Sequence, residues 1–563
     1  MAPAETDRPR LQEYRLERVR TDSGTGFFSC VPKDGDSFEQ HLDVLRHRPM
    51  DEFLHLHLLR AITDWDRDRL AKALSQVPDD DPVLQSLLLE AALIHDRFDH
   101  AGRRRLSAYS PLIYLRSALL SDQDLHRKWT ALLAPNIFNH EPLVQQQIQS
   151  LSPPVTKKPP DPVTFQTLFG QLTGRVEPSR GDPKALEATW RLAMERLAPT
   201  GAVQGVEMRH IASLSPIALL RQWRLSVSVC HGRHRYRLEG DQTAYGRGLS
   251  LAAARAACAM EMVERISAYA DVVDNRLVHL PFSEPLVRAS LSELDRQGRN
   301  ALDPDTLALE VPYKDQQLVW MAGTEATGAG GTPALIPAQC VFLFSNFDEP
   351  ALFSALGSTG LASGNTMAGA RLSALMEIVE RHLDAVTPFD RRQCFTLAGG
   401  DPPVAGLLAD YRARGIHLQF QDIGARFGLP CYRAFVVTAN DSIVRGTGAH
   451  LDGRRAAVAA MTETPYPYPR GPASRPGLTG LPARRIERLP VLSSGSANTD
   501  LMRMETLLRA NGFRIFYADL TRDDIDLPVV RAAVPGLEIL ADFDRYSRVH
   551  PEAFFNFIKT VNA

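Results

Sequence analysis

Two short stretches of the chain carry acidic and basic side chains at spacings that suit chemistry. The stretches contain Glu261, Glu264 and Arg265, and Glu377, Glu380 and Arg381. In each stretch the three residues stand at positions i, i+3 and i+4, which share one face of a helix. Carboxylate pairs on two helices can hold a hard cation such as Mg²⁺, and arginine presents a planar fork to phosphate.

Both stretches belong to an internal repeat. Residues 254–265 and 370–381 are identical at seven of twelve positions with a constant offset of 116, and Gly248 matches Gly364 at that offset. For a single copy, the alternative interpretation is a solvated charged face with one intrahelical Glu–Arg pair. Two copies with preserved neighbours favour two related structural units.

A glycine-containing stretch precedes each predicted helix, at 245–248 and at 358–366. Glycine lets backbone N–H groups approach an anion closely, and a helix N-terminus favours negative charge. We therefore expect both stretches to be turns beside a nucleotide. The usual P-loop does not explain such a site, because the glycine-rich stretch at 328–332 lacks the required lysine.

The remaining sequence predicts the elements that must position these helices. Residues from about 38 to 145 have helical periodicity, with start signals at Asp81-Pro82 and at Ser121 with Asp124. Five prolines between 153 and 162 predict a stiff linker, with an ordered surface loop as the alternative. Helical and β-like runs then alternate, which is typical of an α/β or α+β fold. We expect a helical N-terminal domain over 1–150, a linker over 151–182 and a catalytic domain over 183–563.

Composition narrows the class of protein. A chain of 563 residues is too long for one hydrophobic core of ordinary size. Its 64 basic and 66 acidic residues provide no global charge for binding nucleic acid or an anionic membrane. The six cysteines are scattered without a Cys-x-x-Cys pair, which excludes the common zinc ribbons and fits a reducing compartment. With neither a signal pattern nor an apolar run of membrane length, we expect a cytoplasmic protein.

The repeated Ser-x-x-x-Glu-x-x-Glu-Arg motif and the stretch from Ser358 to Thr366 resemble the YcaO superfamily. Two later stretches, Asp526-Leu-Pro-Val-Val530 and Val534-Pro-Gly-Leu-Glu538, resemble the terminal region of that family, and the resemblance covers roughly 183–545. It implies a duplicated, pseudo-symmetric mixed-sheet domain, here preceded by an all-helical N-terminal domain. It also implies that ATP and Mg²⁺ are the cofactors, bound without a P-loop.

Carried onto this sequence, the resemblance implies a role for each motif residue. The Mg²⁺–ATP ligands would be Glu261, Glu264, Glu377 and Glu380. Arg265 and Arg381 would contact phosphates or orient those glutamates, and Arg247, at a position where the family often has lysine, would contact phosphate. The residues lining the nucleotide would be Ser358, Asn365 and Ser373. The residues assigned to catalysis are Glu377, Glu380, Arg381 and Glu463.

The sequence departs from the family pattern in three places. Ala257 replaces the motif serine in the first copy, and Thr359 replaces an asparagine. The third family motif, usually Thr-Glu-x-x-Gln-x-Arg, reads Thr-Glu-Thr-Pro-Tyr-Pro-Tyr-Pro-Arg over 462–470, with tyrosine at 466 and 468. Two interpretations stay open: Arg470 supplies the missing cation, or this part of the site is altered.

By resemblance, the chain would phosphorylate a backbone amide oxygen of a peptide or protein. Attack by sulfide would then give a thioamide, attack by an amine an amidine, and attack by a side-chain thiol or hydroxyl an azoline. Residues 557–563 lack the proline-rich tail typical of azoline-forming members, so we expect a thioamide-forming or related enzyme. An ATP-binding accessory or scaffold protein, like those implicated in methylthiolation, is the alternative.

Partners follow from the same resemblance. We expect a peptide or protein substrate, a sulfur-donor or leader-binding partner protein, and a homodimer, with neither nucleic acid nor membrane as a partner.

Cys258 lies inside the first motif helix, where we expect a buried structural role. Sulfur for a thioamide would then come from a partner or from free sulfide.

Overall fold

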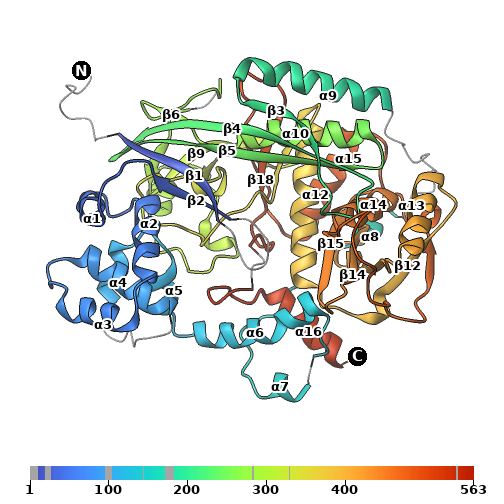
Figure 1. Ribbon diagram of the computed structural model, residues 1–563, viewed down its shortest axis with the longest axis horizontal. Helices are drawn as coiled ribbons and strands as arrows, with labels where there is room; N and C mark the ends of the chain where they lie inside the picture. The colour runs from blue at the N-terminus through green and yellow to red at the C-terminus, as the bar shows by residue number, and fades with distance from the viewer. Residues whose placement is uncertain are drawn as a thin grey trace.

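The computed structural model describes residues 11–19, 27–95, 104–143, 145–170, 183–281, 284–328, 330–540 and 543–562. In these residues three sheets and their helices surround the long helix α12 (Met367–Val386) (Figure 1). The architecture is mixed α/β, as expected, because the first and third sheets combine parallel and antiparallel pairs. The described residues contain no helix that combines the length and the apolarity of a membrane span.

The first sheet has the order β2-β1-β5-β4-β6-β7, with β3 paired to β4. Its strands are β1 (Gln12–Val19), β2 (Phe27–Pro32), β3 (Val203–Arg209), β4 (Ile217–His231), β5 (His234–Gly248), β6 (Val272–Val273) and β7 (Arg276–Leu277). The hairpin of β1 and β2 corrects the expectation of an all-helical N-terminal domain, since β1 pairs in parallel with β5. Tyr14 and Leu16 alternate with charged residues, so β1 buries one face in the core that also contains Tyr236.

The second sheet has the order β10-β9-β17-β18-β11, with β8 paired to β9, and the third has the order β15-β14-β13-β12-β16. The strands of the second sheet are β8 (Val287–Ala289), β9 (Leu318–Ala326), β10 (Gly331–Pro337), β11 (Leu361–Ser363), β17 (Phe516–Asp519) and β18 (Val529–Ala533). Those of the third are β12 (Cys394–Ala398), β13 (Gln419–Asp422), β14 (Cys431–Val437), β15 (Ile443–Ala449) and β16 (Ala483–Arg485).

Helices dominate the described N-terminal region after β2, as the periodicity predicts. They are α1 (Phe38–His47), α2 (Glu52–Thr63), α3 (Arg67–Gln76), α4 (Pro82–Ile94), α5 (Tyr114–Ala118), α6 (Gln123–Asn139) and α7 (Gln145–Gln149). Asp81 caps α4 by accepting a hydrogen bond from the Leu84 N–H, which confirms that start signal. The helix predicted after Ser121 is confirmed as α6, but the predicted capping by Ser121 is wrong. The helix begins after Asp122, whose carboxylate binds Arg548 instead of capping it.

The proline-rich segment has no regular structure until the short helix α8 (Phe165–Phe169). The described part of the segment ends packed against the rest of the protein. Phe165 is buried in a core that also contains Leu375 and Val379 of α12. The Phe165 N–H donates to the Phe427 carbonyl. The part of the predicted linker over 171–182 lies outside the described residues. The C-terminal helix α16 (Pro551–Asn562) packs Phe554 and Phe557 against Trp129 of α6, beside the lower end of α12 (Figure 1).

Two hairpins are each followed by a helix that lies directly on the last strand. Helix α10 (Leu251–Ser267) covers β5, and α14 (Gly453–Glu463) covers β15. A Cβ at Gly246 or Gly248 would collide with α10, and one at Gly446 or Gly448 would collide with α14. This close approach corrects the expectation that 245–248 forms a turn, because these residues end strand β5 and seat the helix.

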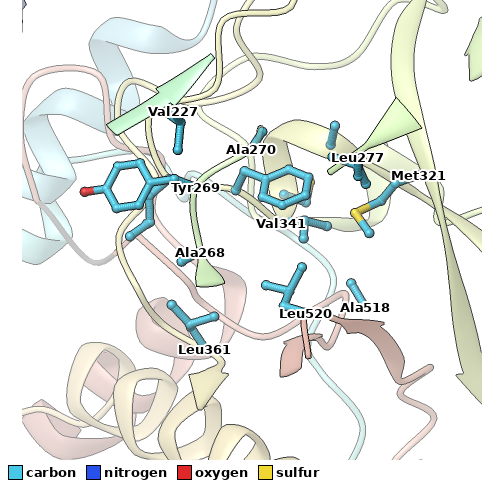
Figure 2. Packing of buried hydrophobic residues seen from close by; sticks show 14 of the residues in the cluster. Val227, Ala268, Tyr269, Ala270, Leu277, Met321, Val341, Leu361, Ala518 and Leu520 are labelled. Carbon is cyan, nitrogen blue, oxygen red and sulfur yellow. The ribbon is translucent and has the colours of Figure 1, made fainter. Parts of the chain in front are cut away.

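The largest core lies between the first two sheets and α10. Figure 2 shows Val227 of β4, Tyr269 and Ala270 after α10, Met321 of β9 and Leu520 after β17 packed together. The other helices after residue 183 are α9 (Pro183–Leu197), α11 (Leu291–Arg296), α13 (Pro402–Ala413) and α15 (Ala497–Ala510). Both copies of the sequence repeat are helical, inside α10 and α12, as predicted.

Candidate active site

Three helices bring the predicted carboxylates into one electrostatic cluster. Helix α10 contributes Glu261 and Glu264, α12 contributes Glu377 and Glu380, and α14 ends at Glu463. The charges act across the helices: Glu377 raises the pKa of Glu264, and Glu463 raises the pKa values of Glu377 and Glu380. Helical spacing placed each pair on one face, and the packing of the sheets brought the three faces together.

Backbone N–H groups of the neighbouring strands hold one glutamate on each motif helix. The Glu261 Oε2 accepts from the Tyr245 N–H at 2.8 Å, and the Glu380 Oε2 accepts from the Ala449 N–H at 2.8 Å. Both donors stand on strands that end the hairpins, β5 and β15. Arg265 lies 3.6 Å from a carboxylate oxygen of Glu261 and 3.6 Å from one of Glu264, so its fork spans both.

Partial burial makes these carboxyl groups weaker acids than usual. Desolvation raises the pKa of Glu264 to about 8 and that of Glu377 to about 7, although nearby arginines oppose both rises. Desolvation also raises the pKa values of Glu261, Glu380 and Glu463. Desolvated carboxylates that repel one another are stabilised by a cation, so the donor set fits a divalent ion.

The spacing of the oxygens indicates how such an ion would be held. In the described part of the chain, two groups have three ligand atoms within 4.8 Å of one another, namely Asp34, Asp36 and His41, and His279, Asp523 and Asp524. The five glutamates form no such group. The site therefore fits Mg²⁺, which retains phosphate and water oxygens as ligands, better than an ion caged by protein alone.

Arginines surround the carboxylates. Burial raises the pKa of Glu463, and the Arg247 and Arg381 guanidinium groups counteract this rise. Arg531 of β18 is only 3% exposed, and burial lowers its pKa to about 10 against the opposing charge of Glu377. Within the described residues, the Nε of Arg247 and the Nη1 of Arg531 are buried without a hydrogen-bond acceptor. Buried donors of this kind suit an anion such as phosphate.

Sequence reasoning missed Arg531. It follows directly on the stretch 526–530 that carried the family resemblance, and this position was its only sequence signal. Its Nη2 donates to the Gly357 carbonyl at 2.9 Å, next to the predicted nucleotide residue Ser358. The arginine thus connects β18 to the stretch that leads into α12.

Two of the predicted nucleotide-lining residues, Ser358 and Asn365, precede α12, and the third, Ser373, lies within it. Ser358 is half-buried, and its carbonyl accepts from the Leu361 N–H. Asn365 is exposed and donates to the Thr189 hydroxyl of α9 at 2.8 Å. Ser373 is exposed one turn before Glu377, and Ala257 is exposed at the matching position of α10.

The altered third motif has a structural explanation. Helix α14 ends at Glu463 because the prolines at 465, 467 and 469 cannot continue it. Tyr466 and Tyr468 are buried in a third core, which also contains Tyr411, Phe420 and Tyr432. Their hydroxyls donate to the Pro472 carbonyl at 2.9 Å and to Asp410 at 2.5 Å. Arg470 is exposed, and the cations that act on Glu463 are Arg247 and Arg381.

Cys258 is buried against β5, with its thiol toward the Ala244 carbonyl, as expected for a structural cysteine. Burial raises its pKa to about 12, so the reactive thiolate is disfavoured. Among the other cysteines, only Cys230 is exposed.

The sequence matches a known protein family and two curated relatives. The sequence model of a protein family described as "YcaO cyclodehydratase, ATP- and Mg²⁺-binding" matches residues 245–465 and 469–538, more than half of the chain. An uncharacterized protein of Methanothermobacter thermautotrophicus is 29% identical over 343 residues, which cover 54% of this chain and 84% of that protein. An uncharacterized protein in the tfuA 3′ region of Rhizobium leguminosarum bv. trifolii is 29% identical over 234 residues, or 39% of this chain and 53% of that protein.

Solved structures resemble the chain more distantly. A heterocyclase in complex with substrate and cofactor shares 21% identity at a TM-score of 0.48, over 63% of this chain and 52% of that one. A YcaO protein from Methanopyrus kandleri bound with AMPPCP and Mg²⁺ shares 20% identity at a TM-score of 0.44, over 65% of this chain and 94% of that one. The chain thus spans about half the length of the heterocyclase.

Proposed function

Because the chain belongs to the YcaO family of ATP- and Mg²⁺-binding proteins, we propose that it phosphorylates a backbone amide oxygen of a peptide or protein. The observation that carries this proposal is the cluster of five half-buried glutamates from α10, α12 and α14. Beside it lie arginine donors that are buried without a hydrogen-bond acceptor among the described residues. An amide oxygen is a poor leaving group, and its phosphorylation converts it into a good one.

Each part of the cluster has a distinct task in this proposal. The metal ligands are Glu261, Glu264, Glu377 and Glu380, and bound Mg²⁺ would neutralise negative charge on ATP phosphates. Arg247 and Arg531 would donate to phosphate oxygens through the Nε and Nη1 groups, which have no acceptor within the described part of the chain. Arg265 orients the α10 glutamates, and Arg381 with Glu463 fixes the charge balance around Glu380.

For the outcome, we propose thioamide formation, in which sulfide replaces the activated oxygen and phosphate leaves. All six cysteines are free, and five of them are buried. A cysteine relay within the chain therefore has no support, and a partner protein or free sulfide is the proposed sulfur source. Amidine or azoline formation would use the same activated amide with another nucleophile.

An accessory role without covalent chemistry is the second candidate. It is favoured by Ala257, which leaves the first motif helix without the hydroxyl that Ser373 supplies on the second. In that case the protein would bind Mg²⁺–ATP and change no substrate.

The test measures phosphate release from ATP with Mg²⁺ and a pool of unmodified peptides, with and without sulfide. We expect peptide-stimulated turnover that Glu377→Ala abolishes and Glu195→Ala preserves, since Glu195 is exposed on α9. Intact mass of the peptides then identifies oxygen-to-sulfur exchange or loss of water. Unchanged turnover in folded Glu377→Ala would refute the enzyme proposal, and ATP binding without any mass change would support the accessory role.

A further inference from the structure

A cavity separate from the glutamate cluster lies where five segments of the chain meet beside His126 and Arg426. It has a volume of about 550 Å³ and contains none of the residues assigned above to ATP or Mg²⁺. The segments are 154–160 of the proline-rich stretch, 306–309, 511–513 with 536–538, and 548–552 at the start of α16. This volume falls in the range of sites that enclose small organic molecules.

Most of the lining is apolar. The apolar lining residues are Pro154, Val155, Pro159, Pro160, Leu307, Ala308, Leu309, Phe513, Val549 and Pro551. Proline fixes the backbone and has no N–H, so the wall over 154–160 is stiff and poor in hydrogen-bond donors. An apolar molecule can be buried against such a wall without leaving a polar group unsatisfied.

Three less exposed charged residues of the lining, Arg426, Arg548 and Glu552, already have partners. Arg426 forms an ion pair with Glu552, and its Nη1 donates to Asn511 at 3.0 Å. Arg548 donates to Asp122 at 3.0 Å and to Gln123 at 3.3 Å. These side chains have little capacity left for a ligand.

The exposed rim of the cavity is positively charged. Lys157 and Lys158 line it from the proline-rich segment, and both are exposed. Lys158 lies 3.5 Å from Asp161, which is also exposed, so this pair contributes little. The rim therefore keeps a positive charge that an anionic group can approach from solvent.

From these observations we propose that the cavity binds a free, elongated apolar carboxylate of the fatty-acid type. Its hydrocarbon body would lie between the proline wall and Leu307, Leu309 and Phe513, and its carboxylate would face Lys157 and Lys158. A peptide fits less well, because its backbone carbonyls would find few donors among prolines and already paired arginines.

The cavity also touches the wall that supports α12. Glu552 lies 3.3 Å from the Nε2 of His382, and the Glu538 N–H donates to the Nδ1 of the same ring at 3.1 Å. His382 follows Arg381 on α12. A bound carboxylate would contact both the proline-rich segment and the start of α16. Because it would bind the folded state, it should raise the melting temperature.

Calorimetric titration of the full chain with dodecanoate tests the proposal, with dodecylammonium as the probe of equal chain length and opposite charge. We expect dodecanoate to bind with one molecule per chain, raise the melting temperature and bind at least about tenfold more tightly than dodecylammonium. Ala308→Trp, which fills the cavity, should abolish binding.

The double variant Lys157→Glu with Lys158→Glu should weaken dodecanoate at least about tenfold, because it reverses the charge of the rim without touching the core. Lys72→Glu, on an exposed lysine of α3, is the matched control and should bind normally. Equal binding of the two probes, or undiminished dodecanoate binding by either cavity variant, would overturn the proposal. Tighter binding of an apolar hexapeptide than of dodecanoate, lost in Ala308→Trp, would also overturn it by assigning the cavity to peptides.

Discussion

Replacement of one site carboxylate by its neutral amide should stabilise the protein while it abolishes ATP turnover. The clearest case is Glu377→Gln. Burial is the largest cause of the high pKa of Glu377, and Glu463 adds to it, although Arg381, Arg265 and Arg531 oppose the rise. Without a cation, ionisation of Glu377 therefore lowers the free energy of unfolding. The neutral amide of Glu377→Gln does not have this effect.

The magnitude follows from the shift. The folded-state pKa of about 7 lies above the ordinary 4.5, so the ionised group destabilises the fold increasingly from pH 4.5 upward and levels off above pH 7. At about 1.4 kcal/mol per pKa unit, the upper limit is about 3 kcal/mol at pH 8 and under about 1 kcal/mol at pH 5. Because Glu377 is half-buried and partly solvated, we expect about 1 to 2 kcal/mol at pH 8.

Urea unfolding with EDTA present, at pH 5 and pH 8, measures this effect. Glu377→Gln should unfold at a higher urea concentration than the unmodified protein, by more at pH 8 than at pH 5, and Glu195→Gln should match the unmodified protein. Added Mg²⁺ and ATP should raise the melting temperatures of the unmodified protein and of Glu195→Gln, but not that of Glu377→Gln. A less stable variant, or a gain independent of pH, would refute the electrostatic reasoning.

Three further predictions concern Arg531, Tyr468 and Glu552. Arg531→Lys keeps a charge but loses the planar fork, so kcat/KM for ATP measured by phosphate release should fall about 100-fold. Tyr468→Phe removes the hydrogen bond to Asp410 and should cost about 1 kcal/mol in urea unfolding with unchanged turnover. Burial raises the pKa of Glu552, but His382, Arg426 and His550 outweigh it and lower the pKa from 4.5 to about 2. The stabilisation from Glu552, at most about 3 kcal/mol at pH 7, should be lost as the pH falls from about 5 to 2, and Glu552→Gln should lack this acid dependence.

Each of these has a contrary result. Full activity in Arg531→Lys would exclude a phosphate contact through the guanidinium fork. A loss of turnover in folded Tyr468→Phe would show that the third motif contributes to the active site. Parallel acid unfolding curves for Glu552→Gln and the unmodified protein would show that the ion cluster around α16 contributes no pH-dependent stability.

The sequence alone was sufficient for features that depend on local geometry. The spacing of Glu261 and Glu264, repeated in Glu377 and Glu380, places each pair on one helical face wherever the helix lies. The same repeat predicted both motif helices, and the mixed α/β class followed from the alternating patterns. These properties are set by residues within a few positions of one another.

The tertiary structure decided how distant elements meet. Residues 245–248 looked like an anion-binding turn, but they end β5 and seat α10. Tyr466 and Tyr468 looked like a damaged active site, yet they pack in the third core. Arg531, the hairpin of β1 and β2, and the proline-lined cavity depend on contacts between segments far apart in the chain. Sequence spacing determines which side chains share a face, whereas only the packing of sheets and helices determines which faces meet.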